Sequence, residues 1–170
     1  FCLSRGLGDV YKRQVVTVEK IDQSVFLVPQ KAKKNWLIQN LEKFDKTVVF
    51  TRTKHGANRL TTDLEKAGIE ALAIHGNKSQ AARQRALGEF HAGRLKVLIA
   101  TDIVARGIHV DDVSHVVNFD LPEEAESYVH RIGRTARAGK SGIAITLCDP
   151  SERAKLRGVE KLTGLRSVSY

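Results

Sequence analysis

Three β-branched segments of this sequence each end in polar side chains. TVVF (47–50) is followed by Thr51, Arg52, Thr53 and Lys54, IEALAI (69–74) by His75, Gly76 and Asn77, and KVLIA (96–100) by Thr101 and Asp102. Hydroxyl groups and backbone amides donate hydrogen bonds to phosphate without reading a base, so the pattern is typical of contacts to a nucleic-acid backbone. The same residue types also cap helices that follow strands, which explains any single position equally well. Their recurrence at three successive ends favours a binding site.

A second group of residues that could bind a ligand lies between His130 and Lys140 (HRIGRTARAGK). Four of these eleven residues are basic and none is acidic. Arg134 and Arg137 are three residues apart, a spacing that could aim both guanidinium groups at one target. The planar guanidinium matches the geometry of phosphate in a way that lysine does not. A solvated basic loop is the alternative interpretation.

Six segments have the pattern of β-strands, and these must position the groups above. They are residues 24–28, 47–51, 69–74, 96–100, 113–119 and 142–147. Several are apolar on both faces, as strands buried between two layers of helices must be. Between the strands, apolar residues recur at spacings of three and four, which predicts helices. These residues are Leu37, Leu41 and Phe44, then Ala57, Leu60, Leu64 and Ala67, then Ala82, Ala86 and Phe90, then Ala125, Tyr128, Val129 and Ile132.

The alternation of strands and helices predicts an α/β domain of three layers, with a mainly parallel central sheet flanked by helices. Gly68 and Gly93 follow predicted helices, where glycine readily adopts the left-handed C-cap. The segment DPSE (149–152) has the composition of a helix N-cap with a capping box. In such sheets ligands bind beyond the carboxyl ends of the strands. We therefore expect the polar groups that follow the strands, and the two guanidinium groups, at that edge.

The composition narrows the class of protein. The chain has 170 residues, about one domain, and 42% of them are hydrophobic, enough to bury one core. A net charge of +9 favours a polyanionic partner. The only cysteines, Cys2 and Cys148, are far apart and lack metal-ligand spacing, so neither a disulfide framework nor a metal site is predicted. This cysteine usage, with no signal peptide or membrane-spanning stretch, predicts a cytoplasmic protein without a membrane partner.

Four segments resemble motifs of one family. VVFTRTKHGA (48–57), Gln80 with Arg83, ATDIVARGIHV (100–110) and HRIGRTARAG (130–139) are similar, in order, to motifs IV, IVa, V and VI of DEAD-box ATP-dependent RNA helicases. These motifs belong to the C-terminal RecA-like domain of that family, and the nearest resemblance is to its bacterial RhlE type. The resemblance covers residues 15–162. We interpret residues 1–14 as a non-native leader and residues 163–170 as a truncated tail, and the lack of any methionine predicts a fragment.

The resemblance implies a role for each matching position. On the nucleotide side, Arg134 and Arg137 would reach the γ-phosphate of ATP, with Arg137 as the arginine finger. His130 would relay between the two halves of the site. Gly107 and His109 would also contact the nucleotide. On the RNA side, the implied residues are Thr53, Gly76, Gln80, Arg83 and Thr101. Asp102 and Arg106 would couple the two sides.

His109 departs from the family pattern. Family members usually carry Asp at this position, where the carboxylate accepts hydrogen bonds from the ATP ribose. A neutral imidazole offers a single acceptor and becomes a cation at mildly acidic pH. We therefore expect nucleotide affinity that is weaker or depends on pH, which a titration of wild type and His109→Asp with ATP at two pH values can test.

The sequence contains no phosphate loop followed by a helix and no Asp-Glu-Ala-Asp run. The resemblance therefore predicts half of an ATP-dependent RNA helicase, inactive alone, that works with an N-terminal RecA-like domain holding ATP and Mg²⁺. Two alternatives remain. A DNA helicase lobe of the same superfamily would be distinguished by competition between RNA and DNA oligomers. A non-catalytic RNA-binding module would be distinguished by coding sequence upstream that lacks the phosphate loop and the acidic Mg²⁺ motif. The sequence indicates no oligomeric state.

Overall fold

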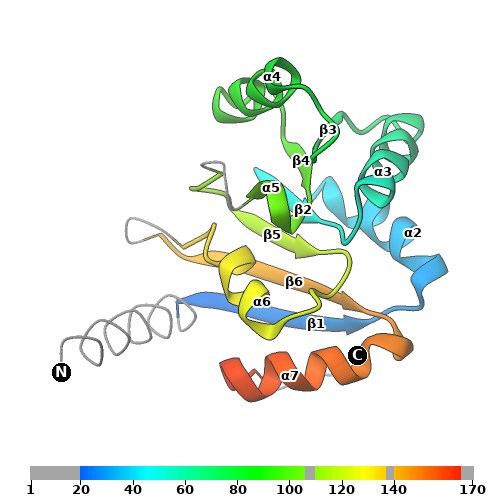
Figure 1. Ribbon diagram of the computed structural model, residues 1–170, viewed down its shortest axis with the longest axis vertical. Helices are drawn as coiled ribbons and strands as arrows, with labels where there is room; N and C mark the ends of the chain where they lie inside the picture. The colour runs from blue at the N-terminus through cyan, green and yellow to red at the C-terminus, as the bar shows by residue number, and fades with distance from the viewer. Residues whose placement is uncertain (1–19, 106–109, 137–139, 166–170) are drawn as a thin grey trace.

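The computed structural model describes residues 20–105, 110–136 and 140–165. Within these ranges, six strands form one parallel sheet in the order β1-β6-β5-β2-β4-β3 (Figure 1). They are β1 (Ile21–Leu27), β2 (Thr47–Phe50), β3 (Ala71–Ile74), β4 (Val97–Ala100), β5 (His115–Asn118) and β6 (Gly142–Cys148). The predicted α/β fold with a parallel central sheet is confirmed, and every predicted strand is present.

Helices connect the strands and cover both faces of the sheet. They are α2 (Gln30–Leu41), α3 (Lys54–Lys66), α4 (Gln80–His91), α5 (Asp102–Ala105), α6 (Ala125–Ile132) and α7 (Arg153–Thr163), with a 3-10 turn η1 (Pro150–Glu152) before α7. In Figure 1, α7 lies near β1 at one end of the molecule, and α4 lies near β3 at the other. None of the described helices combines the length and apolar character needed to cross a membrane.

Alternating side chains of each central strand supply two separate cores. In β2, Val48 and Phe50 belong to one buried cluster and Val49 to the other. The helices α2 and α3 pack on the face of Val49, through residues such as Leu37 and Leu60, whereas α4, α5, α6 and α7 pack on the opposite face. Burying one such side chain stabilises the fold by about 1.5 to 3 kcal/mol relative to exposure. Apolar residues on both strand faces are therefore what a three-layer fold requires.

The predicted caps are present, but two of the apolar residues whose spacing predicts the helices are not buried. Gly68 and Gly93 have positive φ angles of 80° and 77°, and the side chains of Asp149 and Glu152 form the expected capping box. Ala67 and Ala82, however, are exposed. Ala67 is the C-cap residue beyond the last turn of α3, and Ala82 is in the first turn of α4, where only the later residues Ala86 and Phe90 are buried.

A buried ion pair fixes the segment that follows β5. Lys33 of α2 is fully buried, and its Nζ lies 2.7 Å from Glu152 Oε2 and donates to the carbonyl of Phe119 at 2.8 Å. Glu152 also accepts from the backbone N–H of Leu121 at 3.3 Å. Removing one partner of such a pair leaves an uncompensated buried charge, a cost of about 3 to 5 kcal/mol. Because the pair binds the backbone of Phe119 and of Leu121, it holds Asp120, which lies between them in sequence, at the edge where the strands end.

Candidate nucleic-acid interface

The carboxyl ends of β3 and β4 open into a hollow of about 510 Å³. Gly76, Thr101 and Asp102 line it, together with the cations Arg52 and Lys54 and a group of acidic side chains at the start of α6. We call the residues that follow β2, β3 and β4 (Thr51–Lys54, His75–Asn77 and Thr101) the strand-end rim. The structure thus brings together Gly76 and Thr101, two of the five residues implied in RNA binding, with Asp102 of the implied coupling pair.

Thr53 caps the helix that follows β2. Its Oγ1 accepts a hydrogen bond from the backbone N–H of Gly56 at 3.0 Å, and a second hollow of about 440 Å³ lies beside it. Thr51 Oγ1 donates to the carbonyl of Thr53 at 3.2 Å. The capping interpretation is therefore correct for Thr53, and the exposed residue remains accessible from the hollow next to the first one.

Gln80 and Arg83 lie in the first turns of α4. Gln80 is exposed at the first helical position. Arg83 folds back onto the rim, and its Nη2 donates to the carbonyl of Gly76 at 3.0 Å. A guanidinium that donates to this carbonyl fixes the path of the loop after β3. Arg83 therefore shapes the backbone around Gly76 in addition to placing a positive charge beside it.

His75 is a buried neutral connector behind the rim. Its Nδ1 accepts from the backbone N–H of Asn77 at 3.2 Å, so Nε2 carries the proton and donates to Asn58 Oδ1 at 2.7 Å. Burial lowers the pKa of His75, and the positive charges of Lys78 and Lys54 lower it further. The neutral imidazole thereby ties the loop that carries Gly76 to helix α3.

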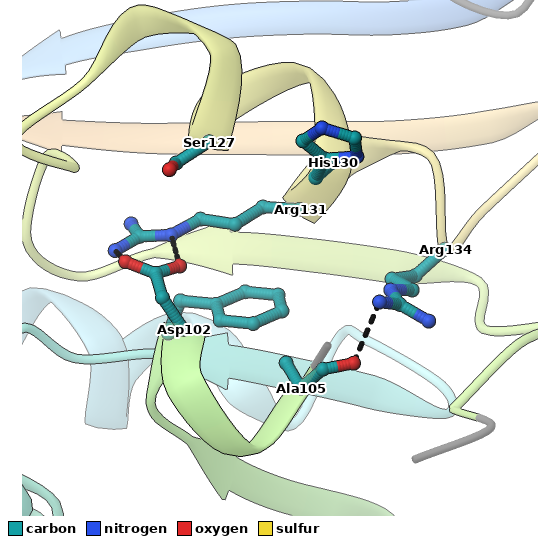
Figure 2. Close-up of a pocket in the computed structure, with 7 residues that line it drawn as sticks. Asp102, Ala105, Ser127, His130, Arg131 and Arg134 are labelled. Carbon is teal, nitrogen blue, oxygen red and sulfur yellow. Dashed lines mark hydrogen bonds and ion pairs between the residues drawn. The ribbon is translucent and has the colours of Figure 1, made fainter. Parts of the chain in front are cut away.

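Arg131 is the residue that the sequence reasoning missed. Its side chain is 2% exposed and forms two parallel hydrogen bonds with Asp102, Nε to Oδ1 at 2.6 Å and Nη2 to Oδ2 at 2.7 Å (Figure 2). Nη1 donates to Asn118 Oδ1 at 3.2 Å and to the carbonyl of Asp120 at 2.6 Å. The guanidinium also lies 5.2 Å from the centre of the Phe50 ring.

A signal for Arg131 was present in the sequence. Tyr128 and Ile132 belong to the apolar spacing that predicts helix α6, and a residue three positions after Tyr128 lies on the same side of a helix. The structure buries Tyr128, Arg131 and Ile132 together. A basic residue inside an apolar stripe indicates a buried partner, since an unpaired cation is seldom buried.

Arg134 lies at a different place from the one expected. The helix α6 runs from the rim back along the sheet, so the residues after it lie beside the amino end of β5, where Thr135 pairs with Val113. Arg134 Nη2 donates to the carbonyl of Ala105 at 2.6 Å, and Nη1 lies 3.6 Å from Asp111 Oδ1. Figure 2 shows Arg131 reaching toward Asp102 at the start of α5, whereas Arg134 reaches toward Ala105 at its end.

We call Asp102, Ala105, Arg131 and Arg134 the α5–α6 junction. A cavity of about 10 Å³, the space of about one water molecule, lies within it and is also lined by His130, which is itself exposed. The other implied nucleotide and coupling residues, Arg137, Gly107, His109 and Arg106, lie outside the described residues. The expectation that Arg134 and Arg137 share one target therefore stays a prediction.

The parallel sheet flanked by helices is a RecA-like α/β fold, and comparisons with known proteins identify its family. Residues 32–139 match the model of the helicase conserved C-terminal domain, so the chain belongs to that family. The chain also matches the structure of the C-terminal domain of the DEAD-box protein Dbp5, with 32% identity, 89% of this chain and 91% of that chain covered, and a TM-score of 0.82. It is therefore the C-terminal helicase domain of a DEAD-box protein.

Two longer relatives place this domain in context. The DEAD-box ATP-dependent RNA helicase CshA of Bacillus licheniformis is 43% identical over 154 residues, which are 89% of this chain and 32% of that protein. A structure of Saccharomyces cerevisiae Dbp5 bound to RNA and ADP BeF3 matches with 33% identity, 89% of this chain, 41% of that chain and a TM-score of 0.80. The chain thus spans about a third of the length of the curated relative. The finer assignment to the RhlE type stays a prediction.

Proposed function

We propose that this domain is the C-terminal lobe of an ATP-dependent RNA helicase, which grips an RNA backbone at the strand-end rim and completes an ATP site. The observation that carries the proposal is the open hollow at the rim, where Gly76 and Thr101 lie beside Arg52 and Lys54. Small and hydroxyl-bearing residues next to cations suit contacts to phosphate and sugar. The structure of a similar protein, S. cerevisiae Dbp5, was solved with RNA and ADP BeF3 bound, which supports the proposal that this domain contacts RNA and a nucleotide.

The RNA side uses groups that do not read bases. Thr53, Gln80 and Thr101 would contact the sugar-phosphate backbone, and Arg83 would hold the carbonyl of Gly76 so that the backbone at Gly76 can approach it. Such contacts make binding sensitive to salt and tolerant of sequence. Closure of this lobe on a second lobe would bend the bound strand and so separate a short duplex.

The nucleotide side uses the α5–α6 junction and the residues after it. Arg137 would act as the arginine finger, which is worth about 10³ to 10⁵ in rate in GTPases. Arg134 is engaged within the domain by Ala105 and Asp111, so its contribution requires these contacts to exchange for phosphate. His130 would relay between the lobes, and Gly107 and His109 would contact the nucleotide.

Asp102 and Arg131 offer a physical link between the two sides. Asp102 lines the rim hollow and also binds Arg131 of α6, three residues before Arg134. A movement of Thr101 and Asp102 on RNA binding would therefore be passed to α6 through a rigid pair rather than through solvent. In this proposal Arg106 takes part in the same coupling.

In the assembled protein, an N-terminal RecA-like lobe would bind most of the ATP molecule and the Mg²⁺. The 170 residues contain neither the phosphate loop nor the acidic Mg²⁺ motif, and phosphoryl transfer in this class depends on both. We therefore propose that the chain alone does not hydrolyse ATP, and that the assembled protein acts in the cytoplasm.

The test is to fuse the chain behind the N-terminal lobe of the B. licheniformis relative and measure RNA-stimulated ATP hydrolysis. Arg137→Ala should reduce hydrolysis by about 10³-fold or more while changing RNA affinity without nucleotide little. Lys140→Ala, which removes an exposed cation from the same loop, is the matched control and should retain hydrolysis. Equal losses of hydrolysis and RNA affinity in Arg137→Ala would contradict the finger assignment. If a DNA oligomer stimulated hydrolysis in place of RNA in the same assay, the result would instead indicate a DNA helicase lobe.

A further inference from the structure

The second hollow at the rim carries an excess of positive charge that the roles above do not use. This hollow, of about 440 Å³, lies between the first turns of α2 and α3. Lys31 from α2 and His55 and Arg59 from α3 line it, and all three side chains are exposed. His55 and Arg59 are four residues apart and therefore lie on the same side of α3. We call this hollow the α2–α3 basic hollow.

The acids of the hollow already have partners, whereas two of its cations have none among the described residues. Asp63 lies 3.5 Å from Lys34, and Asp120 accepts from the backbone N–H of Arg52 at 3.0 Å and from Gln30. Within the described part of the chain, Lys31 and Arg59 make no ion pair or side-chain hydrogen bond. Two unpaired cations that line one hollow repel each other, and an anion placed between them would remove that repulsion.

The position of the hollow indicates which anion it takes. Arg52 lines both this hollow and the hollow of Gly76 and Thr101, so the two adjoin along the edge where the strands end. A strand that leaves the first hollow past Arg52 would enter the second. Thr53 and Gly56 bring small residues and the capped start of α3 to its wall. These groups suit phosphate, which a nucleic-acid strand repeats at regular intervals.

We propose that the α2–α3 basic hollow binds phosphates of the same RNA strand beyond the rim, with Lys31 and Arg59 as the contacting cations. The inference rests on the proposed RNA binding at the rim and extends it to a longer footprint. It assigns no base specificity, because the hollow offers cations, hydroxyl groups and backbone amides.

The experiment measures binding of this chain to two oligouridylates over a series of salt concentrations, one of about five nucleotides and one of about twelve, within the range of single-strand site sizes. The double variant Lys31→Gln/Arg59→Gln removes two cations of the hollow. For the longer strand we expect the slope of log K against log salt to fall by about 1.4, the value for two phosphate contacts to a single strand. For the shorter strand we expect no change.

Two further variants separate this inference from the proposed function. Lys43→Gln/Arg157→Gln removes the same charge from exposed sites, beyond the far end of α2 and on α7, and should leave the slope unchanged. Gln80→Ala/Arg83→Ala should weaken binding of both strands. If the variant of Gln80 and Arg83 binds normally while the hollow variant has lower affinity for the longer strand, the RNA roles of Gln80 and Arg83 fail, whereas the phosphate contacts of the hollow stand.

The opposite results overturn the inference. The hollow does not bind RNA beyond the rim if Lys31→Gln/Arg59→Gln binds the longer strand like the matched control, or if its affinity falls equally for both strands. A third result would assign the hollow to an acidic protein segment. In that case oligoglutamate of the same charge as the longer strand binds more tightly than RNA, and only its affinity falls in the hollow variant.

Discussion

The strand-end rim and the α5–α6 junction are held together by different kinds of interaction. At the rim these hydrogen bonds have neutral acceptors: Thr53 Oγ1 accepts from the N–H of Gly56 at 3.0 Å, His75 donates to Asn58 at 2.7 Å, and the guanidinium of Arg83 donates to the carbonyl of Gly76 at 3.0 Å. At the junction a buried guanidinium meets a carboxylate in two bonds of 2.6 and 2.7 Å. A hydrogen bond to a neutral acceptor is exchanged for one to a ligand at little cost where the groups are exposed, whereas a buried charged pair resists separation. The rim is therefore suited to binding, and the junction to keeping helices in register.

The largest effect that tests this difference is expected for Arg131→Ala. The change leaves the carboxylate of Asp102, the amide oxygen of Asn118 and the carbonyl of Asp120 without their donor. We expect the free energy of unfolding to fall by about 3 to 5 kcal/mol, the usual cost of breaking a buried charged pair from one side. Chemical denaturation of the chain, followed by circular dichroism, measures it.

Two control variants show whether the loss of stability in Arg131→Ala is specific to the junction. Gln80→Ala, at an exposed position of α4 next to the rim, should change the free energy of unfolding by no more than about 0.5 kcal/mol. Asp102→Asn keeps an oxygen that accepts from Arg131 but removes the charge that compensates the buried guanidinium, so its cost should lie between the two. A loss in Arg131→Ala as small as that of Gln80→Ala would show that the junction is no more rigid than the rim.

The strands were predictable because their pattern is local. Strands β2 and β4 are four-residue runs buried on both faces and apolar except for Thr47, and a short β-branched run bounded by turn residues favours a buried strand over a helix. The start of β1 was placed at residue 24 instead of Ile21, since Asp22 and Gln23 interrupt the apolar run. An edge strand tolerates such residues, and among the described strands β1 pairs only with β6.

The junction was not predictable in the same way, because its pairing is not local. Arg131 and Asp102 are 29 residues apart, and a run of basic residues has the composition of a solvated loop. The place of Arg134 depended on the direction of α6, which carries the loop after it away from the strand ends. Among the RNA-side residues, Gly76 and Thr101 were predictable, since they directly follow strands and parallel strands end at one edge.

A smaller effect distinguishes capping from ligand binding at the rim. Thr53→Ala removes the side-chain acceptor for Gly56, and Ser79→Ala removes the equivalent acceptor for Ala82 at the start of α4. Each change should lower the free energy of unfolding by about 1 kcal/mol. Only Thr53→Ala should also weaken RNA binding beyond what Ser79→Ala does, and Thr53→Ser should restore both properties. Equal RNA affinities in the two alanine variants would leave Thr53 with a capping role alone.

The smallest effect concerns the neutral histidine behind the rim. Because the pKa of His75 is lower in the folded protein than its ordinary value, by burial first and then by nearby cations, the unfolded chain takes up the proton at higher pH. The stability that neutral His75 contributes is therefore fully present above about pH 6.5, the ordinary value, and is lost as the pH falls below it. The free energy of unfolding of wild type minus that of His75→Gln should accordingly be larger at pH 7.5 than at pH 5. A difference that stays constant with pH would mean that His75 titrates alike in both states. That result would remove the neutral imidazole of His75 from the contrast between the rim and the junction.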